Sequence, residues 1–379
     1  MKLTRAAVAA GVMASALALA ACGSSGGSDK SSAPAGASTS SASTSASSGG
    51  GSTSGCPSGT LNGEGSTAQT NAMTAWINAF TKKCSGAKIN YNPTGSGAGV
   101  SQFNAGQVNF AGSDSALDPT KGEVAAAAKT CGSTALDLPM VVGPIAVAYK
   151  LNGVKDLTLT PSLLSKIFTG KITTWNDAAI KTANPSATLP STKISVIFRS
   201  DASGTTQNFE KYLAAAAPSD FTATPAKDNA ATVFKGTGAA KSQGVAQAIS
   251  TTEGAIGYDE YSFVATTLST AKIDNGGGAV AVNKTTASAA AGAATVAGTG
   301  DDLTLKIDYA TKTPGAYPII LVTYEIVCTK YKDAAVGTFV KDFLTYTSSD
   351  GQALLTGLGY APLPSALQTK VQASVAKIS

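Results

Sequence analysis

Residues 198–209 read FRSDASGTTQNF, and this stretch gives the clearest indication of how the chain folds. It follows an apolar run, Ile194–Arg199, that is typical of a buried strand, and it leads into Gly204–Ala217, where apolar residues recur at helical spacing. A strand is therefore predicted to pass into a helix within a few residues. The first amide hydrogens of a helix point outward without a partner, and the helix dipole favours negative charge there. Ser203, Gly204 and Thr205 at this point predict an anion site.

Two other stretches repeat this chemistry. GEGSTAQT, residues 63–70, places Ser66 and Thr67 before a predicted helix, and YNPTGSGAGV, residues 91–100, places Ser96 and Gly97 before another. Serine and threonine before a helix are ordinary caps, and most caps bind nothing. The anion hypothesis therefore depends on the charged residues that accompany these turns.

Arg199 is the first such residue. It ends its predicted strand five residues before Gly204, and the only other arginine in the chain is Arg5. A guanidinium offers a planar fork of donors that lysine cannot copy, so a single arginine among many lysines indicates a special task, although a lone surface arginine is the simpler explanation. Asp201, two residues on, is placed to hold the guanidinium, or else it is a turn aspartate.

Asp114 ends the stretch VNFAGSD, residues 108–114, and it is unexpected because a carboxylate repels an anion. Its presence makes sense if the anion carries a proton that it can donate to the carboxylate. Phosphate at neutral pH carries such a proton, whereas sulfate is fully ionised and would meet only repulsion. Asp114 therefore favours a phosphate-like oxyanion.

The whole chain alternates short apolar strands with helical stretches, which predicts an α/β protein whose sheets are covered by helices. The strand candidates are Gly59–Leu61, Lys88–Tyr91, Val108–Ala111, Leu136–Lys150, Ile194–Arg199, Ala255–Tyr258 and Ile319–Val327. The helix candidates are Thr67–Lys83, Pro119–Lys129, Pro161–Phe168, Gly204–Ala217, Lys241–Thr251 and Ala334–Leu344. The Ala/Gly-rich residues 276–300 give no clear pattern.

Composition excludes several functions. The chain has no histidine, so it has no imidazole base, no Ser-His-Asp triad and no histidine-ligated metal, and we expect neither a metal nor a cofactor. Without Lys2 and Arg5, the 28 basic residues become 26 against 23 acidic ones, a net charge of +3 with no dense basic run. Nucleic acid is therefore not an expected partner.

The first 55 residues predict export and attachment to a membrane. Lys2 and Arg5 precede a short apolar run, and LAAC ends it at Cys22, which is the pattern of a signal peptide over residues 1–21 with a lipidated cysteine. The 16 residues from 6 to 21 are too few to span a bilayer comfortably. Residues 22–55, rich in Gly, Ser, Ala and Thr, predict a disordered tether. We expect a chain held at the cell membrane by acyl chains and facing outside the cytoplasm.

Four cysteines follow Cys22, and an even number in an exported protein favours two disulfides over a metal site. They are Cys56, Cys84, Cys131 and Cys328, and they allow three pairings. We favour Cys56 with Cys84 and Cys131 with Cys328, because the first pair would join the start of a strand to the end of the helix that follows it. The other pairings stay open.

Several longer motifs, in order, resemble those of the phosphate-binding proteins of bacterial ABC importers, the PstS type. The likeness covers nearly all of residues 59–365. The motifs are GEGST, GSGAGV, FAGSD, LSKIFTGKITTWND, FRSDASGTT, GAIGY, YPI and LGYAPLP. The resemblance implies a two-lobed, type II periplasmic-binding-protein fold of the α/β class, in which each lobe is a mixed sheet flanked by helices. It also implies that phosphate lies in the cleft between the lobes without a metal.

The resemblance implies a role for each matching residue. Hydroxyl or amide donors would come from the three turns, a proton acceptor from Asp114, a guanidinium ligand from Arg199 and an ion-pair partner for it from Asp201. The donors would be Thr67, Ala68, Ser96, Ser203, Gly204 and Thr205. The sequence departs from the family at Ala68, where an aromatic residue is common, and at Ala202, where glycine is common; neither change removes a phosphate donor.

The resemblance also implies how the lobes and partners are arranged. Residues 56–142 and 318–379 would form lobe one and residues 143–317 lobe two, with crossings near Val142–Ala146 and Thr313–Pro318. All four candidate disulfide cysteines fall in lobe one, which fits their pairing with one another. The expected function is that of an extracellular, high-affinity phosphate receptor, and not an enzyme. It would be a monomer that delivers phosphate to an ABC permease with a cytoplasmic ATPase.

Other functions stay open at this point. A phosphatase-like enzyme on the same fold would need a nucleophile with a base or a metal, and without histidine only Ser, Asp and Lys remain. A scaffolding surface lipoprotein could keep the fold without the ligand. Arsenate, which is also protonated, could replace phosphate as the ligand.

Overall fold

The structure is a computed structural model and describes residues 56–379. The predicted signal peptide, the lipidated Cys22 and the tether lie outside the described residues. Within residues 56–379, no helix combines the length and the apolar character that crossing a bilayer requires.

One large mixed sheet runs through the described residues, and all seven predicted strands belong to it. Its strand order is β2-β1-β3-β14-β4-β8-β6-β7, with β9 paired to β4. Neighbours are parallel at β1–β2, β1–β3, β6–β7 and β6–β8, whereas β14 and β4 run antiparallel to their neighbours. Its strands are β1 (Gly59–Gly65), β2 (Ala87–Pro93), β3 (Phe110–Ser113), β4 (Ala135–Tyr149), β6 (Ser195–Arg199), β7 (Thr237–Ala239), β8 (Ala255–Glu260), β9 (Ser269–Thr270) and β14 (Ile320–Cys328).

The other strands form two smaller sheets. The order of the first is β11 (Ala279–Val280), β10 (Lys272–Asp274) and β5 (Thr158–Leu159), and the second pairs β12 (Thr295–Val296) with β13 (Leu305–Lys306).

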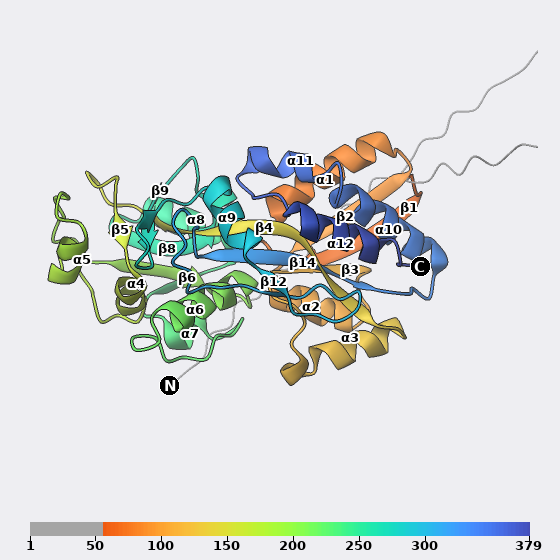
Figure 1. The fold of residues 1–379 in the computed structure, drawn as a ribbon, viewed down its shortest axis with the longest axis horizontal. Coiled ribbons are helices and arrows are strands. Elements are labelled where there is room, and N and C mark those ends of the chain that lie inside the picture. Colours follow the sequence, from red (N-terminus) through yellow and green to blue (C-terminus); the bar gives the residue numbers. More distant parts are fainter. Residues whose placement is uncertain (1–55) are drawn as a thin grey trace, which may run out of the picture. The chain divides into compact units, whose positions relative to one another are not determined.

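The long strands β4 and β14 join the two halves of the large sheet (Figure 1). They pair antiparallel from Cys328 opposite Ala135 to Ile320 opposite Pro144, and β4 then continues beside β8 from Ile145. Every residue of both strands is buried, which explains why their sequences are almost continuously apolar rather than alternating. These two strands are the shared element between the halves.

Helices cover both halves of the sheet (Figure 1). Around β1–β3 lie α1 (Thr70–Lys83), α2 (Ser96–Asn104), α3 (Glu123–Cys131), α10 (Ala334–Thr347), α11 (Gln352–Leu355) and α12 (Ser365–Val375). Around β6–β8 lie α4 (Pro161–Phe168), α5 (Ala178–Ala183), α6 (Gly204–Ala216), α7 (Ala230–Val233) and α8 (Lys241–Thr251). The remaining elements are α9 (Lys284–Gly292) and the 3-10 turns η1 (Pro119–Lys121), η2 (Tyr261–Phe263) and η3 (Thr356–Leu358).

Two predicted helix starts are wrong. The helix predicted from Thr67 begins at Thr70, because Thr67 lies in a turn in which its carbonyl accepts the Thr70 amide at 3.1 Å. The helix predicted from Pro119 is interrupted at Gly122, whose φ of +74° is left-handed, so a 3-10 turn precedes α3. In both places a local turn replaces the first helical residues.

Two large hydrophobic cores lie in the two halves, and we name the halves by them. The first lobe surrounds a core that includes Trp76, Phe110 and Phe343, and the second lobe surrounds a core that includes Trp175 and Phe209. Both tryptophans are fully buried and donate their indole N–H to a backbone carbonyl, that of Gly351 in the first lobe and that of Gly254 in the second. This arrangement satisfies the one polar group of each indole.

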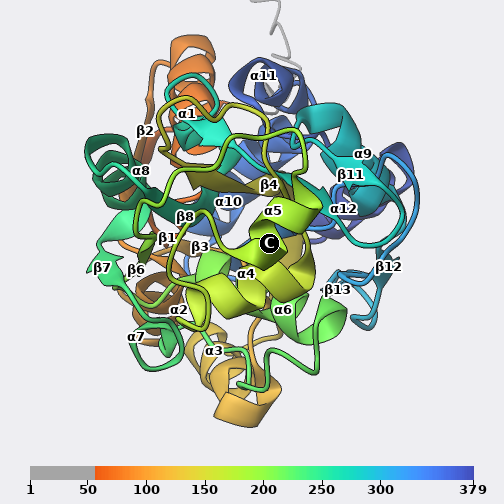
Figure 2. The same cartoon turned by 90° about the vertical axis from the view of Figure 1, so that its left-hand side faces the viewer.

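The predicted bounds of the lobes stay a prediction, because the described residues all fall in one compact unit. The Ala-rich helix α9 lies inside the range predicted for lobe two, yet Ala287, Ala290 and Ala291 pack in the core of the first lobe. Figure 2 shows α9 and β12 on the opposite side of the molecule from β7 and α8.

The two favoured disulfides are present in the structure. Cys56 pairs with Cys84 and Cys131 pairs with Cys328. The second bond lies at the end of the β4–β14 ladder, where Cys328 is opposite Ala135. It therefore closes a loop that contains the whole second lobe.

Candidate anion-binding site

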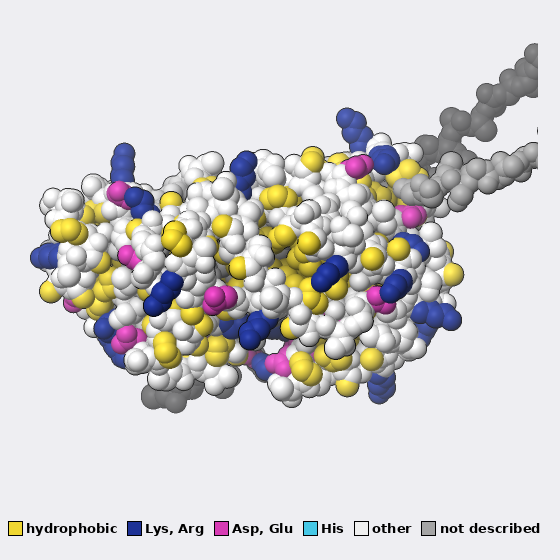
Figure 3. Space-filling model, in the orientation of Figure 1, with side chains coloured by type: hydrophobic (Ala, Val, Ile, Leu, Met, Phe, Trp, Pro, Cys, Tyr) yellow, Lys and Arg dark blue, Asp and Glu magenta, His cyan; other side chains and the backbone are white. Residues whose placement is uncertain are grey.

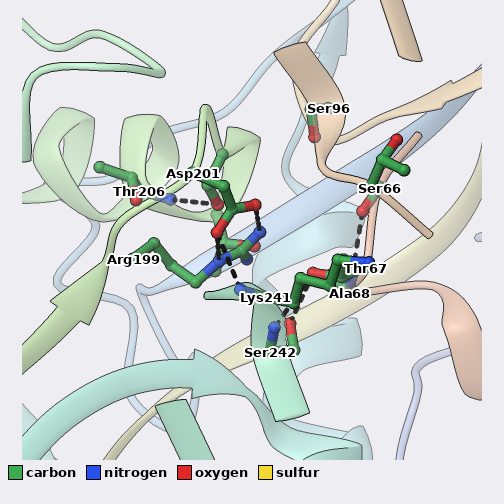
Figure 4. Close-up of polar contacts among 12 residues, drawn as sticks. Ser66, Thr67, Ala68, Ser96, Arg199, Asp201, Thr206, Lys241 and Ser242 are labelled. Carbon is green, nitrogen blue, oxygen red and sulfur yellow. Dashed lines mark hydrogen bonds and ion pairs between the residues drawn. The ribbon is translucent and has the colours of Figure 1, made fainter. Parts of the chain in front are cut away.

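The predicted site residues come together where the two lobes face each other. Thr67 follows β1, Ser96 opens α2 and Asp114 follows β3 in the first lobe, whereas the second lobe contributes the end of β6 and the start of α6. Ala68 also follows β1, but its side chain packs in the core of the second lobe. Figure 4 shows Arg199 and Asp201 on one side of this region and Ser66, Thr67 and Ser96 on the other. The site is thus assembled from two separately packed halves.

Asp114 is the centre of a network of hydroxyl groups. Its Oδ1 accepts hydrogen bonds from Ser66 at 2.5 Å and from Thr323 at 2.8 Å. Its Oδ2 accepts from Ser96 at 3.3 Å and from Thr205 at 3.1 Å, and Thr205 belongs to the second lobe. A carboxylate offers about four lone-pair positions, and four hydroxyls use them here. The arrangement suits a carboxylate that can exchange one hydroxyl partner for another donor.

Burial sets the protonation of Asp114. Only 2% of the residue is exposed, and this burial raises the pKa of its carboxyl above the usual value. The hydrogen bonds from Ser66 and Thr323 and the charge of Arg199 act in the opposite direction. The donors that hold the carboxylate in place therefore offset part of the effect of burial on its pKa.

Arg199 is also buried, with 2% of the residue exposed, and it is held by Asp201. Its Nε donates to Asp201 Oδ1 at 2.8 Å and its Nη2 to Oδ2 at 2.5 Å, a two-point contact that fixes the plane of the guanidinium. Burial alone would lower the pKa of Arg199, but the hydrogen bond and the charge of Asp201 raise it above its usual value. The guanidinium is therefore charged and oriented.

A second acid beside Arg199 carries little charge. Asp259 at the end of β8 is fully buried, and burial raises the pKa of its carboxyl to about 8, against the opposing effect of Arg199. The carboxyl is mostly protonated at pH 7 and so adds little repulsion toward an anion near the guanidinium.

The start of α6 places a helix end at the lobe interface. Ser203 is the N-cap and its Oγ accepts the Thr206 amide at 3.3 Å, so its hydroxyl serves the helix in this structure. Gly204 lies against the first lobe: a Cβ there would be 2.7 Å from both Asp114 Cβ and Ser96 Oγ. Glycine is required because the two lobes approach so closely.

Ala202, one of the two departures from the family pattern, also lies at this interface. Its carbonyl accepts the Gly97 amide at 3.0 Å, and a Cβ on Gly97 would be 2.5 Å from the Ala202 methyl group. Gly97 thus leaves room for the methyl group that Ala202 adds.

Ser242, at the start of α8, is a functional candidate that the sequence analysis missed. It is fully buried in the second lobe, its amide donates to Thr67 Oγ1 at 3.2 Å, and its Oγ lies 3.0 Å from the same atom (Figure 4). Thr67 Oγ1 can accept both hydrogens, which leaves its own O–H free to donate to a ligand. The passage from β7 to α8 reads Ala239–Ala240–Lys241–Ser242, with no glycine beside the serine, so the pattern of the three predicted turns did not point to it.

Other residues that complete the site lacked a sequence signal. Thr323 is one polar side chain within the apolar strand β14, and Asn208 lies on α6, where its Nδ2 donates to the Asp114 carbonyl at 2.6 Å. Asn208 Oδ1 in turn accepts the hydroxyl of Tyr309. Both positions follow from pairing between distant segments.

The described residues 56–379 hold no group of three or more His, Cys, Asp or Glu side chains that could bind a metal ion. The chemistry that the site offers is therefore hydrogen bonding to an oxyanion by hydroxyls, amides and one guanidinium, beside one carboxylate acceptor.

Comparison with known proteins identifies relatives of the chain. Residues 50–350 match the model of the PBP superfamily domain. Phosphate-binding protein PstS3 of Mycobacterium bovis is 45% identical over 325 residues, which cover 84% of this chain and 87% of the relative. Phosphate-binding protein PstS of Xylella fastidiosa is 31% identical and covers 83% and 84%.

A solved structure is similar as well. The high-affinity periplasmic phosphate-binding protein PfluDING, determined with bound phosphate, superposes with a TM-score of 0.68 at 25% identity. The match covers 83% of this chain and 93% of that protein.

Proposed function

Because this chain belongs to the PBP superfamily and, within it, to the PstS phosphate-binding proteins, we propose that its interlobe site binds inorganic phosphate for an ABC importer. The observation that supports this most is the contrast between the two charged groups: the oriented guanidinium of Arg199 and the hydroxyl-surrounded carboxylate of Asp114. The first attracts an oxyanion, and the second accepts a proton from it. The protein is a receptor and has no catalytic step of its own.

The donors for phosphate are the predicted residues, and two of them change partner on binding. Ser96 and Thr205 both donate to Asp114 Oδ2. When phosphate enters, these hydroxyls turn to its oxygens, and Oδ2 accepts the O–H of the ligand in their place. The amides of Ala68, Gly204 and Thr205 and the hydroxyl of Thr67 complete the donor set, with Ser203 at the helix start.

Selectivity follows from this exchange. Sulfate cannot donate a proton, so its binding would leave Asp114 Oδ2 without the hydroxyl donors and facing a negative oxygen. Protonated phosphate fits the same position with a hydrogen bond. Arsenate is protonated in the same way and fits the site by the same argument.

Transport requires the two lobes to open and close around the strands β4 and β14, along the predicted lobe bounds except that α9 moves with the first lobe. The closed form is presented to permease subunits that are driven by a cytoplasmic ATPase, and the receptor acts as a monomer. Lipidation of Cys22 and the tether of residues 22–55 hold the receptor at the outer side of the cell membrane, where released or scavenged phosphate arrives.

Calorimetric titration of the purified protein with phosphate tests the function. We expect one phosphate per chain and a melting temperature that rises with phosphate concentration. A protein that gives no heat and no rise in melting temperature would be a scaffolding lipoprotein. Release of phosphate from an ester by the protein would instead indicate an enzyme.

A further inference from the structure

Lys227 and Glu123 form a largely buried ion pair between the two lobes. Lys227 lies between α6 and α7, in the second lobe, and Glu123 opens α3, in the first. The Lys227 Nζ lies 3.1 Å from both carboxylate oxygens of Glu123. The side chains are 7% and 18% exposed, so this contact is shielded from water far better than an ordinary surface ion pair. Figure 3 shows basic and acidic side chains close together beside a hollow between the lobes.

Contacts within the first lobe hold Glu123 in place without the help of Lys227. Its Oε2 accepts the Asp118 amide at 2.7 Å, and its own amide donates to the Asp118 carbonyl at 3.0 Å. It also lies in the first turn of α3, where a negative charge is favoured by the helix dipole. The carboxylate is therefore oriented by its own lobe alone.

Lys227 connects this contact to the phosphate site. Its backbone carbonyl accepts the amide of Ser203, the N-cap of α6, at 2.8 Å. The neighbouring Ala226 amide donates to Glu210 Oε2 of α6 at 3.0 Å. These two hydrogen bonds tie the segment that contains Lys227 to the start of α6, which supplies donors in the proposed phosphate site.

A second interlobe pair lies beside the first and differs in exposure. Lys121 and Asp228 are adjacent in sequence to the same two segments, but their charged atoms are 3.9 Å apart and their side chains are 48% and 69% exposed. Exposed pairs of this kind contribute little. The structure therefore contains a matched control for the buried pair.

We propose that Lys227 and Glu123 form a latch that is made only when the lobes close, and that it slows the release of phosphate. When the lobes part, both side chains return to water, so the pair stabilises the closed form relative to the open one. The latch touches no ligand, and Lys227 acts as a positioning residue. The proposal rests on the proposed function, since it concerns the closing of the same site.

A double-mutant cycle in the rate of phosphate dissociation tests the latch. Glu123→Gln keeps an acceptor for the Asp118 amide, and Lys227→Met keeps the length of the side chain. We expect each variant to release phosphate at least about tenfold faster, and the double variant to be no faster than the faster single one. Lys121→Met and Asp228→Asn, the control pair, should change the rate less than about threefold. The latch would be overturned if the increases in dissociation rate of the two single variants multiplied in the double variant. Dissociation rates equal to that of the parent would also overturn it.

Melting temperatures separate a latch from a residue that merely stabilises the fold. The latch predicts that Lys227→Met melts like the parent without phosphate and below it with saturating phosphate. Glu123→Gln also loses its charge at the start of α3, so it should lose more stability with phosphate than without it. Equal losses with and without phosphate would overturn the proposal. If the parent itself binds no phosphate, the proposed function fails; if the parent binds and the variants release phosphate at its rate, only the latch fails.

Discussion

The two lobes are stabilised by different means. The first lobe contains both disulfides of the described chain, whereas the second lobe has no cysteine there; aromatic rings pack in both cores. In the second lobe the Phe168 and Phe209 ring centroids are 4.8 Å apart, and the Phe209 ring stacks on Tyr258 at 4.6 Å. Tyr258 also accepts the Arg199 amide at 3.2 Å, so this aromatic cluster directly supports the end of β6.

The lobes also differ in the charge that they bring to the site. The first lobe presents the acceptor, Asp114, and the second presents the cation, Arg199. Neither lobe alone offers both an attraction for an oxyanion and a means of recognising its proton. In the proposed function, Arg199 of the second lobe would attract the oxyanion and Asp114 of the first lobe would select for its proton, so the site needs both lobes together.

Removal of the Cys131–Cys328 disulfide is expected to give the largest effect. The two cysteines are 197 residues apart, against 28 for Cys56–Cys84, and loop-closure entropy grows with the length of the closed loop. We expect Cys131→Ser/Cys328→Ser to lower the free energy of unfolding by about 5 kcal/mol and Cys56→Ser/Cys84→Ser by about 3.5 kcal/mol. Urea denaturation of both variants measures this. Equal losses would contradict the view that the Cys131–Cys328 bond stabilises the fold by closing the loop that contains the second lobe.

Arg199→Ala removes the cation that the second lobe contributes to the site. Removal of a buried, oriented charge should weaken phosphate binding by roughly 2 to 5 kcal/mol, measured by calorimetry. Arg199→Lys is the matched control: it keeps the charge but loses the two-point contact with Asp201, so its affinity should lie between those of the parent and the alanine variant. Unchanged affinity in the alanine variant would show that the site is elsewhere.

Asp137→Asn tests how a buried carboxyl of the first lobe makes the stability of the protein depend on pH. Asp137 is buried in the first lobe, and burial together with the charge of Asp302 raises the pKa of its carboxyl to about 7. Its stabilising effect is present below the unfolded pKa of about 4 and is lost as pH rises through about 7. Asparagine keeps an acceptor for the Leu117 amide without the charge.

Denaturation at several pH values checks this prediction. Relative to Asp137→Asn, the parent should lose on the order of 2 kcal/mol of stability between pH 5 and pH 7. Parallel stability profiles for the two proteins would mean that Asp137 titrates alike in the folded and unfolded chains.

Asp114→Asn breaks the contribution of the first lobe to selectivity. The variant no longer repels a fully ionised anion, and its amide can donate to one. We expect the ratio of phosphate to sulfate affinity to fall at least about tenfold, or about 1.4 kcal/mol. Competition titrations measure the ratio. A variant that rejects sulfate as well as the parent does would remove this explanation of Asp114.

Much of the fold was predictable because its signals are local. The apolar run of Leu136–Lys150 marks the strand β4, and the motif around Arg199 marks the passage from β6 to α6. The resemblance to phosphate receptors supplied the roles of the individual site residues. Those roles stay a prediction until phosphate binding is measured.

The remaining features depend on contacts that sequence spacing does not reveal. Thr323 reaches Asp114 across 209 residues, and Lys227 reaches Glu123 across 104. Helix α9 has small residues that pack against a distant core, although its capping box of Asn283 and Thr286 is a local signal that could have been recognised. The register of the strands and the contact between the lobes, rather than a local sequence motif, bring these residues to their partners.

Titration of the purified protein with phosphate in a large excess of sulfate shows whether the site excludes an anion that carries no proton. In the proposed site, protonated phosphate would bond to both Arg199 and Asp114, whereas sulfate would bond only to Arg199. We predict that roughly a hundredfold excess of sulfate leaves the phosphate isotherm unchanged. A curve shifted to weaker apparent phosphate affinity by that excess would contradict the division of affinity and selectivity between the two lobes.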